Sequence, residues 1–194
     1  MKIAILGWGS LIWDPRNLLI DKSIGINGWF DEGPMLPIEF ARISKDGRLT
    51  LVIVPGKTNI QTSYAISKYK ELDPSILDLA VREGCGKNKI GNLIGGEDII
   101  QSKIPTKKTI ENWLKQNEGL DAVIWTDLSG NFNDKLNKEL TAKNAVYYLN
   151  SLSSDIRAKA EEYVRKTPLF VQTDIRSLIE SELGWKQIPL SIVD

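Results

Sequence analysis

The opening segment Ile3–Arg16 holds the residues of this chain that are best suited to a small-molecule site. Its turn, Gly7–Leu11 (Gly-Trp-Gly-Ser-Leu), follows a short apolar run. Glycines let several backbone N–H groups approach one ligand and point in one direction, which suits a carboxylate or another anion. Ser10 adds a hydroxyl, and Trp8 and Trp13 add aromatic walls. A tight strand-to-loop turn with two core tryptophans would explain the same residues without a ligand.

Two nucleotide-binding motifs use glycines in a similar way, and neither is complete here. The dinucleotide fingerprint is Gly-x-Gly-x-x-Gly at the start of a helix, but Ile12 occupies the third glycine position and Pro15 follows soon after. A phosphate-binding P-loop ends in Gly-Lys followed by Ser or Thr, which this turn lacks. A nucleotide-binding protein is therefore an alternative rather than the leading interpretation.

The composition limits the chemistry that such a site could perform. The chain contains no histidine, which excludes His-dependent triads, Cys–His dyads and His-ligated metal sites built from this chain alone. Proton transfer near neutral pH would need Glu, Asp, Lys, Tyr or Cys. The single cysteine, Cys85, can form no disulfide within the chain. Since no histidine is present to activate it, we interpret Cys85 as a small, buried or half-buried residue.

Charge and hydropathy argue against two classes of partner. The chain has 25 basic and 25 acidic residues, whereas a sequence-independent grip on nucleic acid needs a basic excess. The basic stretch Lys103–Lys108 is too short to change this. The apolar run at Ile3–Leu6 is too short for a signal-peptide core or a membrane span. We expect a cytoplasmic protein that binds neither nucleic acid nor a membrane, and the oligomeric state is left open.

The elements that would position this site are strands, most of them in the first half of the chain. Asp46-Gly47 is a strong turn signal between two apolar runs, which predicts a β-hairpin. A loop or short irregular strand is expected over Lys87–Gly96. The predicted strands are Lys2–Leu6, Leu36–Ile43, Leu49–Val54, Thr62–Ile66 and Asp121–Thr126.

One helix is expected in the first half of the chain, and helices dominate the second half. The helix of the first half is expected to open at Asp73-Pro74, with Asp73 as its N-cap, and to end at Gly84. The other predicted helices are Thr106–Asn117, Asp134–Leu149, Ser154–Arg165 and Asp174–Leu183. These elements predict one mixed α+β domain over 1–194, with a small barrel or twisted sheet in 1–100 and a mainly helical continuation over 101–194.

The opening turn and the residues that follow it resemble a known protein family. The segment Gly7–Pro15 (Gly-Trp-Gly-Ser-Leu-Ile-Trp-Asp-Pro) resembles the opening of the γ-glutamylcyclotransferase superfamily, and most closely its ChaC-type branch. One position differs clearly, because Trp8 stands where the family has tyrosine. The family also has a glutamate near a helix end and close to a glycine, a place that Arg82-Glu83-Gly84 fills here. Leu36–Arg42 loosely resembles the strand between these two, so the resemblance covers roughly residues 1–95.

The resemblance implies a γ-glutamylcyclotransferase-like fold and an internal aminolysis. The α-amine of a γ-glutamyl amide attacks its own γ-carbonyl, which forms 5-oxoproline and releases an amine or peptide. Glu83 is then the general base and acid, with Glu71 and Glu97 as alternatives, and the Gly7–Leu11 backbone holds the α-carboxylate. Arg42 could bind a substrate carboxylate. Such a lyase or acyltransferase needs no metal and no cofactor, and its partner is a small γ-glutamyl compound.

Each of these residues also has a plainer explanation. Glu83 could be a solvated helix-end glutamate paired with Arg82, and Arg42 an ordinary ion-pair partner. Trp29-Phe30 is expected in a loop, where it would line a pocket mouth or an interface. Together with Trp8, the unmatched second half favours one alternative, an inactive small-molecule-binding or protein-interaction protein on the same fold. The remaining tryptophans are expected in the core, namely Trp113, Trp125 and Trp185.

Overall fold

The computed structural model describes residues 1–96 and 106–188. These residues form a mixed α+β structure, which confirms the predicted class. The chain divides into two compact units, each built from several separate stretches. Unit 1 comprises 1–7, 14–36 and 61–128, and unit 2 comprises 8–13, 37–60 and 129–194. The units therefore do not divide at residue 100, and the single domain predicted over 1–194 stays a prediction.

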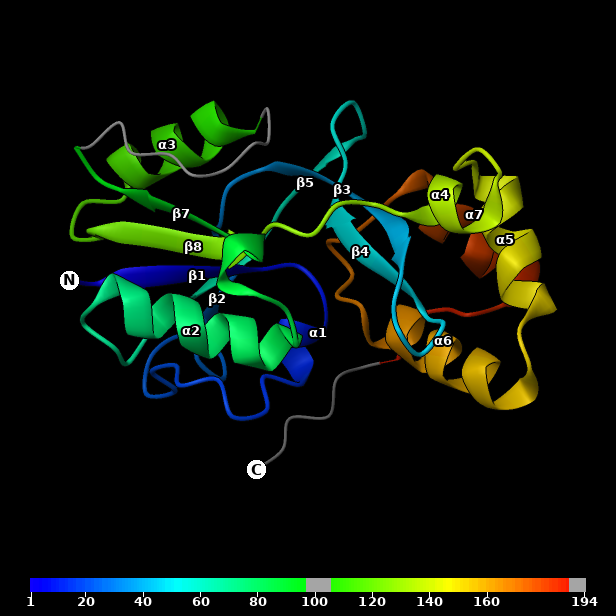
Figure 1. The fold of residues 1–194 in the computed structure, drawn as a ribbon, viewed down its shortest axis with the longest axis horizontal. Coiled ribbons are helices and arrows are strands. Elements are labelled where there is room, and N and C mark those ends of the chain that lie inside the picture. Colours follow the sequence, from blue (N-terminus) through cyan, green and yellow to red (C-terminus); the bar gives the residue numbers. More distant parts are fainter. Residues whose placement is uncertain (97–105, 189–194) are drawn as a thin grey trace. The chain divides into compact units, whose positions relative to one another are not determined.

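Unit 1 is built on a five-stranded sheet, which can be followed in Figure 1. Its strands lie in the order β2 (Trp29–Phe30), β6 (Ser63–Ile66), β1 (Ile3–Gly7), β8 (Ala122–Thr126) and β7 (Ile90–Ile94). The central strand β1 runs antiparallel to β6 and parallel to β8. Every residue of β1 is buried, as a continuous apolar run predicts for a strand covered on both faces. The helices of this unit are α2 (Leu72–Glu83), the short η1 (Lys87–Lys89) and α3 (Lys107–Gln116).

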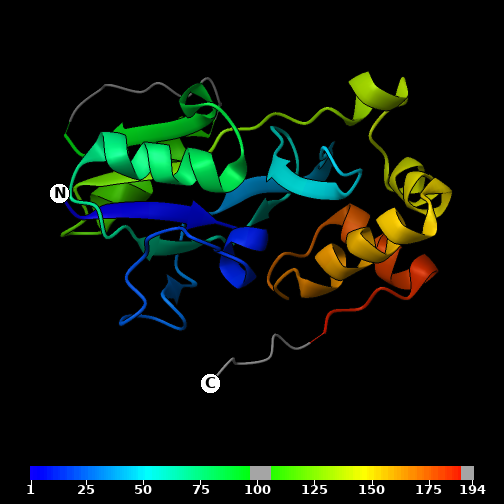
Figure 2. The same cartoon turned by 60° about the horizontal axis from the view of Figure 1, so that its bottom comes forward.

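Unit 2 combines a three-stranded sheet with five helices among the described residues. The sheet has the order β4 (Leu49–Ile53), β3 (Leu36–Ile43) and β5 (Asn59–Ile60). In Figure 2, β4 is the cyan arrow and β3 is the bluer strand that precedes it. The hairpin turn is the predicted one, with Gly47 at a φ of 83°. The helices are α1 (Ser10–Trp13), α4 (Phe132–Leu136), α5 (Ala142–Ser151), α6 (Ser154–Lys166) and α7 (Asp174–Leu183).

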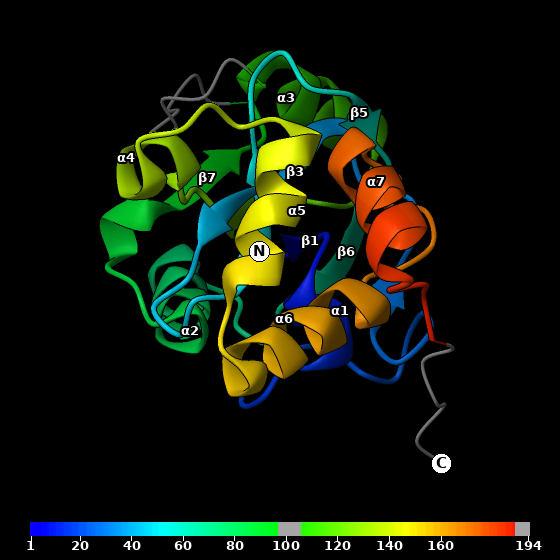
Figure 3. The same cartoon turned by 90° about the vertical axis from the view of Figure 1, so that its right-hand side faces the viewer.

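Helix–helix contacts hold the second unit together. Helix α5 packs on α7 and α6, and the short α1 lies against α6 (Figure 3). This last contact joins the opening segment of the chain to its C-terminal half. Within the described residues, none of the helices is long and apolar enough to cross a membrane.

The expectation of one helix over Asp134–Leu149 was wrong. Two helices, α4 and α5, occupy this region, and Asn137 separates them with a left-handed backbone (φ 51°) that asparagine tolerates better than most residues. Thr141 then starts α5, since its side chain accepts a hydrogen bond from the Asn144 N–H at 3.1 Å. The apolar pattern continues across the break between α4 and α5, and the break itself is set by Asn137 and by the Thr141 cap.

Other boundaries also differ from expectation. Trp29-Phe30 forms β2 rather than a loop, and α2 begins one residue before Asp73, with Glu71 in the N-cap position. The glycine-rich stretch after Cys85 forms η1 and a regular strand, β7. Gly91 is required there, because a Cβ at this position would collide with the indole of Trp125 on β8. Within the described residues the strands form two separate sheets, and no closed barrel is present.

Candidate functional site

Glu83 is the last residue of α2, and a glycine cap fixes that position. Gly84 adopts a left-handed conformation with a φ of 63°, and the Cys85 N–H donates to the Ala80 carbonyl at 3.0 Å. This is the hydrogen bond of a Schellman cap, which turns the chain away from the helix axis. The predicted helix end at Gly84 is confirmed. The Glu83 side chain is 16% exposed, so it is half-buried at the end of the helix rather than fully solvated.

A buried arginine holds the Glu83 carboxylate. Nη1 of Arg82 lies 2.7 Å from Oε1 of Glu83, and the Arg82 side chain is only 5% exposed. A charge-assisted hydrogen bond of this length fixes the orientation of a carboxylate more firmly than a neutral one. The ion pair with Arg82 is also what the plainer interpretation of Glu83 expects.

The same arginine joins the opening segment to the end of α2. Nη2 of Arg82 donates to the Asp14 carbonyl at 2.6 Å, and Nη1 of Arg16 donates to the Arg82 carbonyl at 3.3 Å. All of these residues belong to unit 1. The two stretches that carry the family resemblance, one around Asp14 and one around Glu83, are therefore neighbours although 68 residues separate Asp14 from Arg82.

The turn that follows β1 belongs to unit 2, where Trp8 has a structural partner. Its indole Nε1–H donates to the Leu51 carbonyl at 3.4 Å, and Trp8 is 6% exposed. Strand β4, which carries Leu51, is an edge of its sheet, so its outward amide and carbonyl need partners from outside the sheet. Trp8 thus provides a hydrogen-bond partner for the outward carbonyl of Leu51.

The hydroxyl of Tyr163, on α6, is the partner of the outward N–H of Leu51. The Leu51 N–H donates to Oη of Tyr163 at 3.2 Å. This oxygen also lies against the turn, because a Cβ added to Gly9 would be 2.7 Å from it. A residue with a Cβ at position 9 would therefore collide with the Tyr163 hydroxyl, whereas glycine leaves room for it. Sequence reasoning missed Tyr163, which is indistinguishable from a core aromatic on an amphipathic helix far along the chain.

The predicted site residues fall into both units. Gly7 and Glu83 belong to unit 1, and the others belong to unit 2, namely Trp8, Gly9, Ser10, Leu11 and Arg42. The structure brings Glu83 together with Asp14 and Arg16 through Arg82, and it brings Trp8 and Gly9 together with Leu51 and Tyr163. A cavity shared by Glu83 and the Gly9-Ser10 backbone stays a prediction.

The remaining candidates have other surroundings. Nη1 of Arg42 donates to the Ser129 carbonyl at 2.8 Å, which ties β3 to the segment before α4. The substrate role of Arg42 stays a prediction. Of the alternatives to Glu83, Glu71 is the N-cap residue of α2, while Glu97 lies outside the described residues, as does part of Lys103–Lys108.

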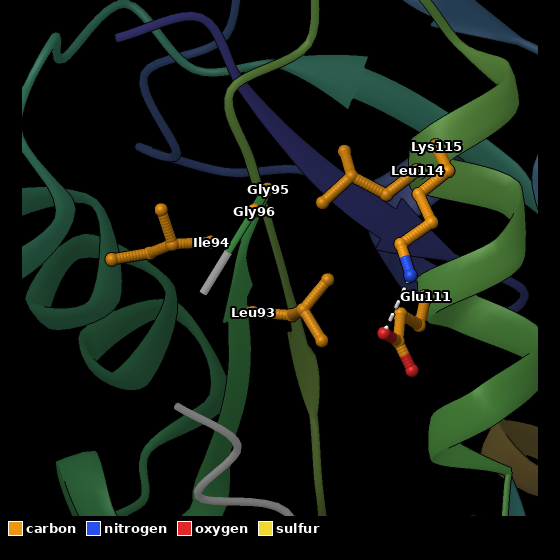
Figure 4. A pocket seen from close by; sticks show the side chains of 7 residues that line it. All are labelled: Leu93, Ile94, Gly95, Gly96, Glu111, Leu114 and Lys115. Carbon is orange, nitrogen blue, oxygen red and sulfur yellow. Dashed lines mark hydrogen bonds and ion pairs between the residues drawn. The ribbon is translucent and has the colours of Figure 1, made fainter. Parts of the chain in front are cut away.

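A separate hollow lies in unit 1, between the end of β7 and α3 (Figure 4). Its volume is about 110 Å³, and Leu93, Ile94 and Leu114 are its apolar lining residues. At one side, Nζ of Lys115 pairs with Oε1 of Glu111 at 2.9 Å. None of the predicted site residues lines this hollow, so it is distinct from the candidate site.

Unit 2 contains a buried carboxyl group. Glu39, on β3, is 2% exposed and accepts a hydrogen bond from the Phe40 N–H at 2.7 Å. Burial raises the pKa of Glu39, while hydrogen bonds from the Thr173 side chain and from the Phe40 and Ile175 amides act in the opposite direction. Because Thr173 and Ile175 lie at the start of α7, Glu39 ties this helix to the sheet of unit 2.

No known protein family, curated protein or solved structure matches this chain. Among the described residues, no group of three His, Cys, Asp or Glu side chains is arranged to hold a metal ion. The candidate site is therefore defined by the geometry around Glu83 and by the residues of the opening segment.

Proposed function

We propose that the protein is a γ-glutamylcyclotransferase-like enzyme. It converts a γ-glutamyl amide to 5-oxoproline and releases an amine or peptide. The observation that supports this most directly is the hydrogen bond from Arg82 to the Asp14 carbonyl, at 2.6 Å. It joins the end of the family-like opening segment to the residue beside Glu83, although these stretches are distant in sequence.

Glu83 carries the proton transfers in this proposal. Its carboxylate takes a proton from the substrate's α-ammonium group, and the free amine then attacks the γ-carbonyl carbon. A carbon–nitrogen bond forms to close the five-membered ring, and the bond from the γ-carbon to the leaving nitrogen breaks. Glu83 returns this proton to the leaving nitrogen, which regenerates the carboxylate. The new ring nitrogen still carries two hydrogens after the attack and gives up one of them, through Glu83, to the departing amine. The products are then a neutral lactam nitrogen and an ammonium group on the released amine or peptide.

Arg82 positions the carboxylate for this work. Its side chain is buried, and it contacts both the Glu83 carboxylate and the Asp14 carbonyl. Because the Arg82 guanidinium is fixed by both contacts, it holds the Glu83 carboxylate in one orientation before a substrate binds. This arrangement favours a preorganised base. In this proposal Arg82 acts through Glu83 and is a positioning residue.

The opening turn holds the substrate. Both reacting groups belong to one molecule, so the main task of the protein is to keep the γ-glutamyl chain bent. Backbone N–H groups of Gly7–Leu11 bind the α-carboxylate, and Arg42 is the candidate for a further carboxylate of the substrate. The proposal involves no metal and no cofactor in these steps.

A second candidate function is binding without turnover. The observation that favours it is the position of Trp8, whose indole is buried against the Leu51 carbonyl where the family has tyrosine. On this alternative the protein binds γ-glutamyl compounds or a protein partner on the same fold, and the Arg82–Glu83 ion pair is structural.

One assay separates the two functions. The purified protein is incubated with a panel of γ-glutamyl peptides and γ-glutamyl amines, and 5-oxoproline and the released amine are quantified together. Formation of both products in equal amounts supports the enzyme. Saturable binding of a panel member, followed by tryptophan fluorescence and without either product, supports the binding protein instead.

A further inference from the structure

A tyrosine from the C-terminal part of unit 2 places its hydroxyl beside Gly9 of the opening turn. Oη of Tyr163 accepts a hydrogen bond from the Leu51 N–H at 3.2 Å. The same oxygen lies 2.7 Å from the point where a Cβ of Gly9 would be. The hydroxyl thus lies between the edge of β4 and the turn.

The ring of Tyr163 is fixed on several sides. Trp13 meets it edge-on with ring centroids 5.5 Å apart, and Phe40 does so at 6.3 Å. The guanidinium of Arg48 lies over the ring at 5.6 Å. A ring that is held by three neighbours keeps its hydroxyl in one place.

The hydroxyl has a role that the ring alone does not explain. A phenylalanine would preserve the contacts with Trp13, Phe40 and Arg48, but it would leave the outward N–H of Leu51 without this acceptor. It would also remove the oxygen that lies 2.7 Å from the point where a Cβ of Gly9 would be. The tyrosine oxygen is therefore positioned between the edge of β4 and Gly9.

We propose that Tyr163 is a positioning residue that holds the Trp8–Leu11 turn in the conformation that binds the substrate's α-carboxylate. The inference rests on the proposed function and adds to it a residue from the half of the chain that the family resemblance does not cover. Tyr163 acts through the backbone of the turn, so its loss weakens substrate binding and leaves the proton transfers at Glu83 intact.

The test compares Tyr163→Phe with Tyr148→Phe. The control removes a hydroxyl of the same kind from the same unit, since Oη of Tyr148 donates to the Gly47 carbonyl at the hairpin tip, at 2.7 Å. Three quantities are measured for each variant. They are the amide hydrogen exchange of peptides covering residues 8–13, and KM and kcat for a γ-glutamyl peptide.

For Tyr163→Phe we expect faster exchange in the 8–13 peptides, a KM raised roughly fivefold, and a kcat within about twofold of wild type. Tyr148→Phe should leave all three unchanged. Unchanged exchange in Tyr163→Phe would overturn the inference, and so would faster exchange with an unchanged KM or a loss confined to kcat. If the wild type forms no 5-oxoproline, the proposed function fails, while the exchange rates still decide whether Tyr163 positions the turn.

Discussion

Arg82 and Glu83 are consecutive residues at the end of one helix, and their side chains form an ion pair with 2.7 Å between Nη1 and Oε1. Adjacent side chains on a helix do not usually face each other. Here the guanidinium is buried and also donates to the Asp14 carbonyl, so the opening segment holds the arginine beside the carboxylate. This arrangement gives the first prediction.

Replacing Arg82 by lysine should impair catalysis more than binding. A lysine keeps the charge but lacks the planar fork that reaches the Glu83 carboxylate and the Asp14 carbonyl together. We expect kcat to fall about tenfold or more and KM to change little.

The matched control is Arg165→Lys, which alters an Arg–Glu pair of similar length, 2.9 Å, on the surface of α6. This control should retain wild-type kinetics, because exposed pairs contribute little. An Arg82→Lys variant with wild-type kcat would show that the ion pair has no part in catalysis.

Gly9 and Tyr163 should be energetically coupled. Gly9→Ala places a Cβ 2.7 Å from the tyrosine oxygen, and we expect it to lower the free energy of unfolding by about 1–3 kcal/mol. In a Tyr163→Phe background the nearest ring atom, Cζ, is 3.7 Å from that Cβ, which is an ordinary contact.

The double variant Gly9→Ala/Tyr163→Phe should therefore be more stable than the sum of the two single changes predicts. Urea unfolding of all four proteins measures this coupling. Strictly additive losses would mean that the hydroxyl does not limit the residue type at position 9.

Glu39 should make the stability of the protein depend on pH. Its pKa is raised above the ordinary value of 4.5 in the folded protein, so the folded state binds the proton more tightly than the unfolded chain. The resulting stabilisation is complete below the ordinary value and is lost as the pH rises through the folded pKa. The Glu39→Gln variant has no such titration.

As the pH rises from about 4 to about 7, the unfolding free energy of the wild type should consequently fall relative to that of Glu39→Gln. Urea unfolding at several pH values measures it. Glu118→Gln is the control, because Glu118 is exposed. A difference that stays constant, or that grows in favour of the wild type, would contradict the raised pKa.

Much of the fold follows from local signals in the sequence. Strand β3 and helix α7 have the predicted bounds, Leu36–Ile43 and Asp174–Leu183. In α7 the side chain of Thr173 caps the first turn and Gly184 ends the helix, so both boundaries are encoded within a few residues. The break at Asn137 was not predicted, because the apolar pattern continues across it.

The candidate site was predictable only where its signals are local. The glycine turn and Glu83 before Gly84 are visible in short stretches of sequence. The contact of Arg82 with Asp14 and the fit of Tyr163 to Gly9 join residues that are far apart along the chain. Such pairs depend on how the elements pack, and periodicity carries no information about them.

The measurement that tests the central claim most directly is 5-oxoproline formation by Glu83→Gln, beside wild type and Glu118→Gln. The amide keeps the size of the side chain but cannot take a proton from the substrate's ammonium group. We expect wild type and Glu118→Gln to form 5-oxoproline at equal rates, and Glu83→Gln to be at least about a hundredfold slower. A Glu83→Gln variant as active as wild type, or a wild type that forms no 5-oxoproline from any γ-glutamyl substrate, would contradict the proposed function.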